Sequence, residues 1–379
     1  MDNDVTRTIL LADPEGMLNE EIPILIDEWQ LAPSLWNFVR HQVDKGLKPG
    51  SVLFTGSSIR INAKIHSGAG RIIRMKMRPF SIEERSMNDT YIRVTDLFSI
   101  QTNQKISGKT DKKMNDYLTE IYLSGFPGIR KMSERLRKKM IASYIENISE
   151  HEFEQNGFPS VRPESLNAWM RAYAAAIATT TQFQTIIDSA MANNEQAPTR
   201  PTATSYREAL QKLYIIDEVP SFLGFGKLFP NLAKSSKHFM LDPAIALSLL
   251  GVERENLENY HVPHHVGKLN QTFIGQLLES LVYQSLVVYA QTTDSKLYHL
   301  RENRGKREID FILQRGNTLI LFEVKADPEA KNSYVEHLNW VEERVKEEFK
   351  VVKVLLNTGP RAFTRSDGVH VVPISMLGV

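Results

Sequence analysis

Two acids and a lysine come close together in the segment REIDFILQRGNTLILFEVKA. Asp310 lies in the first apolar run, RGN at 315–317 is typical of a tight turn, and Glu323 and Lys325 lie two apart in the second run. Because side chains two apart on a strand share a face, we expect Glu323 and Lys325 to project together. A hairpin brings Asp310 beside them, and converging carboxylates need a positive charge between them.

A hard divalent cation suits that position, since Mg²⁺ takes oxygen ligands and keeps several waters. Lys325 could orient a metal-bound water or stabilise charge on an attacked phosphate. Glu279, on an otherwise apolar helix face, could supply a third carboxylate. The segment therefore predicts a magnesium site with Glu279, Asp310 and Glu323 as ligands, and solvated ion pairs are the alternative.

A second acid pair follows an apolar run near the N-terminus. ILIDEWQ places Asp27 and Glu28 at the carboxyl end of a predicted strand. In a P-loop ATPase the Asp of such a pair holds the Mg²⁺ shell and the Glu directs the attacking water. The alternative is a helix N-cap, a position that carboxylates favour.

The next predicted strand, VLFTGSS, ends in polar residues that could sense a γ-phosphate: Thr55, Ser57 and Ser58. Arg71, in GAGRIIRM, is a candidate for stabilising charge on the transferred phosphate. The sequence therefore predicts half of a nucleotide site, with Asp27 as a metal ligand and Glu28 as a catalytic group.

The elements that position these residues indicate an α/β, multidomain chain. EIPILI, SVLF and GRIIRMKM are predicted strands of a parallel sheet, residues 101–115 an exposed loop, and NNEQAPTRPTATS a linker. We expect a partial P-loop-type domain over 1–115, a helical winged-helix region over 116–262, and a third domain over 263–379. The third domain should run helix, three strands, helix, two strands.

The middle region has the outline of a winged helix-turn-helix, with YREALQKLYII as its recognition helix. Arg207 and Lys212 would then face outward and contact DNA phosphates. Protein docking is the alternative. The basic run from Arg130 to Lys139 fits a solvated helix face, with phosphate binding as the lesser alternative.

Composition excludes several classes of protein. The 46 basic and 45 acidic side chains nearly cancel, so a nucleic-acid site would have to be local. The absence of cysteine excludes disulfides, thiolate zinc sites and cysteine nucleophiles. The acidic N-terminus is unlike a signal peptide and the apolar runs are short of a bilayer span, so we expect a cytoplasmic protein without a membrane partner.

Taken in order, IPILIDEWQLAP, PGSVLFTGSS, GRIIRMKMRPFSIEE, YLSGFPG, KHFMLDP, GQLLESLV and EIDFIL/FEVKA resemble a known assembly. They are similar to prokaryotic AAA-like ATPases that carry a C-terminal domain of unknown function (family 4143) with a PD-(D/E)XK restriction-endonuclease-like fold. The resemblance implies an active-site set of Glu279, Asp310, Glu323 and Lys325, with two metal ions possible. It also implies ATP as a ligand, held near Asp27, Glu28, Ser57 and Arg71.

The chain departs from this resemblance in one respect. The phosphate-binding pattern Gly-x-x-x-x-Gly-Lys-Ser/Thr occurs nowhere in it, and that loop supplies the amides and lysine that cradle phosphate. We therefore expect an ATPase-family protein that acts on or near nucleic acid and that lacks ATP hydrolysis. The alternatives are a Mg²⁺-dependent nuclease with a scaffold N-terminal part, and a non-catalytic interaction protein. Besides nucleic acid, the partners that we consider are a second copy of the chain, in a homo-oligomer, and another protein.

Overall fold

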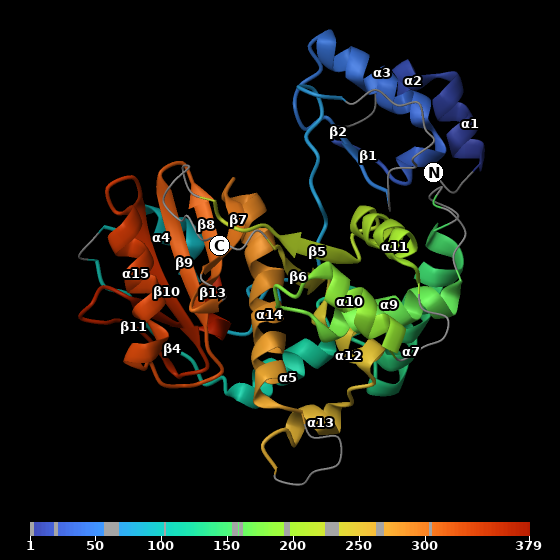
Figure 1. Cartoon of the computed structure of the whole chain (residues 1–379). Helices are drawn as coiled ribbons and strands as arrows, with labels where there is room; N and C mark the ends of the chain where they lie inside the picture. The colour runs from blue at the N-terminus through green and yellow to red at the C-terminus, as the bar shows by residue number, and fades with distance from the viewer. Residues whose placement is uncertain are drawn as a thin grey trace. The chain divides into compact units, whose positions relative to one another are not determined.

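A computed structural model describes residues 4–18, 22–56, 68–101, 104–153, 158, 162–192, 198–223, 235–262, 269–302 and 305–379. The chain forms two compact units (Figure 1). Unit 1 comprises residues 1–77 and 147–161, and unit 2 comprises residues 78–146 and 162–379. The predicted boundaries of three domains stay a prediction.

Unit 1 is a small α/β unit built on two parallel strands. Its elements are α1 (Asp4–Ala12), α2 (Pro14–Met17), β1 (Ile24–Ile26), η1 (Trp29–Leu31), α3 (Pro33–Asp44), β2 (Val52–Phe54) and η2 (Ile148–Glu152). Strands β1 and β2 pair in parallel, as the sequence predicts. The core beside them is aromatic, with the rings of Trp29 and Trp36 4.8 Å apart and Phe54 5.4 Å from Trp36.

The strand predicted over GRIIRMKM is wrong. Residues 72–78 have no regular secondary structure, and the side chains of Ile73, Met75 and Met77 are 89%, 82% and 93% exposed. An apolar run becomes a strand only when a neighbouring strand takes its backbone hydrogen bonds. Among the described residues of unit 1, only β1 and β2 form such a pair.

The helical part of unit 2 lies between residues 114 and 258. Its elements are α5 (Met114–Leu123), α6 (Pro127–Arg130), α7 (Glu134–Asn147), α9 (Pro163–Ala175), α10 (Phe183–Ala192), α11 (Arg200–Lys212), β5 (Ile216–Val219), β6 (Lys237–Met240), α12 (Pro243–Leu250) and α13 (Arg254–Glu258). Strands β5 and β6 pair antiparallel. Helix α11 begins inside the predicted linker, because Thr199 caps it and a proline occupies its first turn.

A mixed seven-stranded sheet forms the rest of unit 2, in the order β4-β11-β12-β10-β9-β8-β7. The remaining elements are β3 (Ile92–Arg93), α4 (Val94–Ser99), β4 (Ser107–Lys109), α14 (Gln271–Thr292), β7 (Lys296–Glu302), β8 (Arg307–Arg315), β9 (Thr318–Val324), η4 (Asn332–Tyr334), α15 (Glu336–Val345), β10 (Lys350–Asn357), β11 (Arg361–Thr364), β12 (His370–Pro373), η5 (Ile374–Met376) and β13 (Leu377–Gly378). Helices α14 and α15 lie on opposite sides of this sheet (Figure 1).

The segment 101–115, predicted as an exposed loop, is in part a strand. Residues 107–109 form β4, which pairs antiparallel with β11 at the sheet edge. Thr110 follows it and is buried, with its backbone N–H donated to the carbonyl of Pro360. The polar composition of this segment suits an edge strand, where one side of the backbone has no partner strand.

A β-bulge interrupts the pairing of β7 with β8. Tyr298 faces Ile312 and Leu300 faces Ile309, so His299 alone stands opposite both Asp310 and Phe311. Bulges turn side chains out of the regular alternation of a strand and are frequent beside functional sites. Here the bulge includes a residue that the sequence marked as functional.

Helix α14 packs against this part of the sheet. Among the described residues it is the one helix long and apolar enough to cross a membrane, but 67% of its most apolar window is buried inside the protein. Its Tyr283 ring stacks on Phe239 at 4.0 Å, and Phe239 lies 5.7 Å from Phe311. The contacts are those of a core helix.

Candidate functional site

The acid pair of unit 1 lies at the carboxyl ends of two paired parallel strands. Asp27 follows β1 and Thr55 follows β2, and the Thr55 hydroxyl donates a hydrogen bond of 2.5 Å to Asp27 Oδ1. Backbone bonds fix this edge, because the Thr55 N–H donates to Ile26 and the Thr55 carbonyl accepts from Trp29. Asp27 is exposed, so its carboxylate is available to a ligand.

Glu28 is held by its neighbour rather than by a helix. Its backbone is left-handed, with φ of 50°, and its side chain makes no capping hydrogen bond to η1. Gln30 Nε2 donates to the Glu28 carboxylate, and the Gln30 amide oxygen is buried without a hydrogen-bond partner. Positive φ is costly for a residue other than glycine. Glu28 therefore stands at the N-cap position of η1, as the alternative predicts, but its side chain does not cap that helix.

Arg71, also predicted for the nucleotide site, is paired with a different acid. Arg71 Nε donates to Asp44 Oδ1, at the end of α3, at 2.5 Å. Ser57 lies outside the described residues, as does Ser58. The structure therefore brings together Asp27, Glu28 and Thr55, and it pairs Arg71 with a different acid.

In unit 2 the hairpin of β8 and β9 brings together the acids predicted from REIDFILQRGNTLILFEVKA. Phe311 pairs with Phe322, which sets Asp310 opposite Glu323, and the Val324 N–H donates to Asp310 Oδ2 at 2.9 Å. Lys325 Nζ lies 2.5 Å from Glu323 Oε1. The predicted sharing of a face by Glu323 and Lys325 agrees with this contact.

A lysine that the sequence did not single out enters the same cluster. Lys237, the first residue of β6, is 1% exposed. Its ammonium forms an ion pair with Glu279 of α14, and lies 3.0 Å from Asp310 Oδ1 and 3.6 Å from Glu308 Oε1. Glu279 and Asp310 therefore meet through Lys237. We call Glu279, Asp310 and Glu323, with Lys237 and Lys325, the carboxylate cluster.

Burial and neighbouring charge shift the ionisation of this cluster. Burial, and then the charge of Asp310, raises the pKa of Glu323 to about 8. The same two causes raise the pKa of Glu279 well above its usual range. Burial opposes ionisation of Asp310 as well, but Lys237 and Lys325 hold its pKa below the usual value. Asp310 is therefore the carboxylate that most readily carries charge.

The cluster does not fit a divalent cation with Lys237 where it lies. Both oxygens of Asp310 are engaged, and Glu279 faces an ammonium group. Across the described ranges, no three His, Asp or Glu side chains are grouped so as to hold a metal ion. The metal-ligand roles of Glu279, Asp310, Glu323 and Asp27, and the catalytic role of Lys325, stay predictions.

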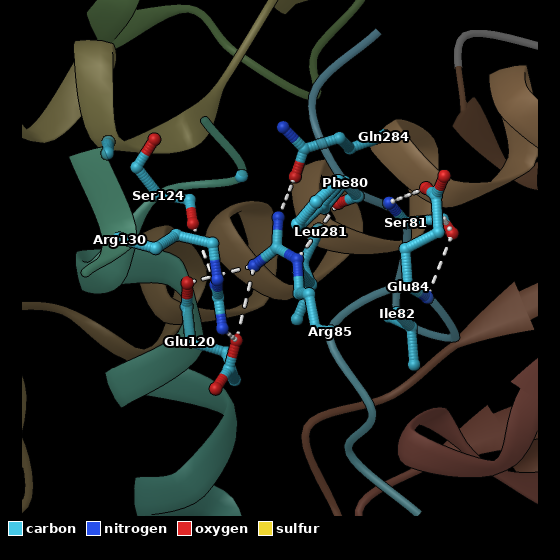
Figure 2. Close-up of polar contacts among 12 residues, drawn as sticks. Phe80, Ser81, Ile82, Glu84, Arg85, Glu120, Ser124, Arg130, Leu281 and Gln284 are labelled. Carbon is cyan, nitrogen blue, oxygen red and sulfur yellow. Dashed lines mark hydrogen bonds and ion pairs between the residues drawn. The ribbon is translucent and has the colours of Figure 1, made fainter. Parts of the chain in front are cut away.

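A second buried polar network, centred on Arg85, joins several of the motifs that carried the sequence resemblance (Figure 2). Arg85 donates from Nε to the carbonyl of Phe80 and from Nη1 to the carbonyl of Glu120, each at 2.9 Å. Its Nη2 donates to Gln284 Oε1 on α14. The Glu120 carboxylate in turn pairs with Arg130 at 2.8 Å.

Asp242 extends this network to α12. Its Oδ1 accepts the N–H of Ala244 as an N-cap, and its Oδ2 accepts the hydroxyl of Ser124 and the N–H of Gly125. Gln284 Nε2 also donates to Asp242 Oδ2 at 3.0 Å. RPFSIEER, YLSGFPG and KHFMLDP thus meet at one buried point on α14.

Sequence reasoning missed Lys237, Arg85 and Gln284. A lysine that opens the apolar strand KHFM was the available signal for Lys237, because a charge buried there needs partners. Arg85 follows the acidic pair of SIEE, and Gln284 interrupts the apolar face of α14. These signals mark burial but do not identify the partners.

Three families match successive parts of the chain. A family described as an AAA domain matches residues 2–86, a domain of unknown function (DUF8612) matches residues 114–256, and a domain of unknown function (DUF4143) matches residues 274–377. No curated protein matches the chain.

Among solved structures, the chain is similar to Can2 from Sulfobacillus thermosulfidooxidans in complex with cyclic tetra-adenylate. The identity is 12%, the TM-score is 0.22, and the match covers 69% of this chain. The chain spans 58% of the length of that protein. The segment similar to an AAA domain includes Asp27 and Thr55, and the segment similar to DUF4143 includes Asp310 and Glu323.

Proposed function

We propose that the chain is an AAA-like ATPase-family protein with a nuclease-like C-terminal domain. It acts on or near nucleic acid in the cytoplasm, and it does not hydrolyse ATP. The observation that carries the ATPase part is the contact between Asp27 and Thr55 at the ends of paired parallel strands. It lies inside the segment that matches an AAA domain.

Asp27, Thr55 and Glu28 fit one half of a nucleotide site. An exposed carboxylate and a hydroxyl are oxygen ligands of the kind that Mg²⁺ takes. Bound Mg²⁺ would neutralise charge on the β- and γ-phosphates. Glu28, held by Gln30, would orient a water near Asp27. The phosphate-cradling loop pattern is missing from the sequence, so these residues have no partner loop in this chain.

A calorimetric titration with MgATP tests this part. We expect binding weaker than micromolar and no hydrolysis, with Glu28→Gln unchanged from wild type in an ATPase assay. Any weak affinity should fall in Asp27→Asn and persist in Asp44→Asn, since Asp44 pairs with Arg71 instead. Micromolar affinity for MgATP would contradict the expected weak binding, and measurable release of phosphate would contradict the proposed loss of hydrolysis. Weak binding that Asp27→Asn leaves unchanged would contradict the proposed site.

The order of elements supports the nuclease-like part. Helix α14, the antiparallel strands β7, β8 and β9, helix α15 and the parallel strand β10 follow one another as the resemblance to a restriction-endonuclease-like fold implies. Asp310 on β8 faces Glu323 on β9, and Lys325 follows. This is the order in which the acids and lysine of that fold are expected.

Nucleic-acid binding is tested by fluorescence anisotropy with labelled single-stranded DNA, duplex DNA and RNA over a range of salt concentrations. We expect affinity for at least one of them that falls with salt. No binding at low salt would contradict action on nucleic acid and favour a protein-interaction role. The winged-helix proposal is weaker, because Arg207 of α11 pairs with Glu218 and stacks over Phe183.

A metal-dependent nuclease is the second candidate, and the contact of Lys325 with Glu323 beside Asp310 favours it. With Lys237 in the cluster we expect no cleavage by the wild-type chain. Mg²⁺-dependent nicking that is lost in Lys325→Ala and kept in Lys346→Ala would make the nuclease the better candidate. Lys346 is a suitable control because its partner, Glu343, lies outside the cluster.

A further inference from the structure

Lys237 is a buried cation supplied by a segment distant from the acids that it contacts. It comes from β6, 73 residues before Asp310, and its side chain is almost entirely covered. Burying a lysine is costly unless it is paired, and three carboxylates surround this one: Glu279, Glu308 and Asp310. The position of the ammonium is therefore set by the acids.

The ammonium group of Lys237 occupies carboxylate oxygens that a metal cation would need as ligands. Asp310 uses one oxygen for Lys237 and the other for the Val324 N–H. Glu323 uses one oxygen for Lys325, and its other oxygen is buried without a hydrogen-bond partner. That unpartnered oxygen, on a side chain 8% exposed, is an independent sign that the cluster has unused capacity for a positive ligand.

A divalent ion and the Lys237 ammonium cannot share these acids. Both would have to lie within contact distance of Asp310 and Glu279, where like charges repel strongly because little water screens them. A neutral side chain of similar length at position 237 would remove the repulsion and would let Glu279 and Asp310, which Lys237 now holds apart in its own ion pairs, close on a metal ion. The acids would then be uncompensated, which favours uptake of a hard cation.

We propose that Lys237 is a built-in counter-ion that keeps divalent cations out of the carboxylate cluster, and that the cluster is a latent divalent-cation site. Lys237 acts indirectly, because it holds Glu279 and Asp310 in its own ion pairs, and it is therefore a positioning residue. The proposal goes beyond the proposed function, since it concerns cation binding and holds whether or not the chain acts on nucleic acid.

The experiment compares the full-length wild type with Lys237→Met, using MnCl₂ as the probe in calorimetry and electron paramagnetic resonance. We expect no saturable binding below millimolar Mn²⁺ in the wild type. The Lys237→Met variant should bind with at least tenfold higher affinity, and its thermal midpoint should rise with added Mn²⁺. The double variant Lys237→Met/Asp310→Asn should lose this binding.

Lys353→Met is the matched control. Lys353 is also a buried lysine of unit 2, bonded to Asn339 and to the carbonyl of Asp367 and paired with Glu342. Its replacement removes a buried charge but leaves the carboxylate cluster intact, so Lys353→Met should gain no Mn²⁺ affinity. An equal gain in Lys353→Met would overturn the assignment to the cluster.

Two other results would overturn the proposal. One is wild-type binding of Mn²⁺ at micromolar concentration that Asp310→Asn abolishes. The other is a folded Lys237→Met variant that binds no better than wild type. If Lys237→Met is poorly folded without metal, Mn²⁺ should restore its folded circular-dichroism signal, and the shorter Lys237→Gln should respond likewise. Failure of Mn²⁺ to restore either variant would also contradict a latent site.

Discussion

Arg85 is the residue on which separate segments of unit 2 converge. It lies in the segment that begins unit 2 and donates to Phe80, to Glu120 of α5 and to Gln284 of α14. Burial lowers the pKa of Arg85, and the charges of Asp242 and Glu120 act against that shift. A buried guanidinium with several acceptors is costly to remove, because each acceptor is left without its partner.

Arg85→Met should therefore destabilise unit 2 strongly. Breaking a buried charged network by removing one partner costs about 3–5 kcal/mol of unfolding free energy. Arg93→Met is the control in the same segment. Arg93 pairs with Glu83 and donates to the carbonyl of Val379, but its side chain is 47% exposed, and surface pairs contribute about 0–1 kcal/mol. Urea denaturation followed by circular dichroism measures both, and equal losses would contradict the role given to Arg85.

His299, opposite the bulge in β8, should make stability depend on pH. Burial, together with the charge of Lys237, lowers the pKa of His299 from 6.5 to about 4. Arg301 lowers this pKa further, and Asp310 and the hydrogen bond to the Ser235 carbonyl act in the opposite direction. The neutral imidazole is thus the form that the fold accommodates.

Because the folded-state pKa is depressed, the unfolded chain binds the extra proton first as pH falls. The contribution of His299 is fully present above pH 6.5 and is lost as the pH falls toward about 4. The loss is on the order of 3 kcal/mol at most, from the size of the shift. Urea midpoints of wild type and His299→Gln, measured across this range, should show a flatter pH profile in the variant. Parallel profiles would contradict the assignment.

At the scale of elements, the sequence pattern predicted correctly those strand pairs whose strands lie close together in the sequence. The turn at Gly316 and Asn317 fixes the register of β8 and β9, so Asp310, Glu323 and Lys325 could be placed together from the sequence. The parallel pair β1 and β2 followed from two short apolar runs with a helix between them. The contact of Asp27 with Thr55 follows from that pairing.

What could not be predicted depends on distant partners. Lys237 reaches Asp310 across 73 residues, and no spacing rule covers such a contact. Strand β4 forms because its backbone pairs with β11, which lies more than two hundred residues away in the sequence. The run GRIIRMKM has the composition of a strand but no partner strand in the described part of unit 1. Pairing across long separations is decided by the tertiary fold rather than by propensity.

The exposed apolar side chains of that run lead to a prediction for the segment. Ile73, Met75 and Met77 are exposed, so replacing all three with serine should change the unfolding free energy by less than about 1 kcal/mol. The same change should reduce aggregation, because contiguous exposed apolar side chains promote association. Light scattering and thermal unfolding measure the two effects. The control is Ile26→Ser, in the buried core of unit 1, which should unfold that unit. A similar loss of stability in the triple variant would contradict the exposed position of Ile73, Met75 and Met77.

For the whole molecule, the two candidate sites belong to units with separate cores. The core of unit 1 contains Trp29, Trp36 and Val39, next to the Asp27 site. The core under the sheet of unit 2 contains Leu338, Val341 and Leu355. Each site therefore depends on the packing of its own unit, and a defect in one core should not by itself remove the side chains of the other site.

Thermal unfolding should therefore show two transitions that single core substitutions move one at a time. Truncating a buried tryptophan costs about 3–5 kcal/mol through lost contacts and the cavity left behind. Trp36→Ala should lower only the transition of unit 1, since Trp36 packs on Trp29 and Phe54. Trp169→Ala should lower only that of unit 2, where Trp169 is fully buried against Tyr173. Differential scanning calorimetry separates the two midpoints, whereas one cooperative transition lowered by both variants would show that the units fold as a single body.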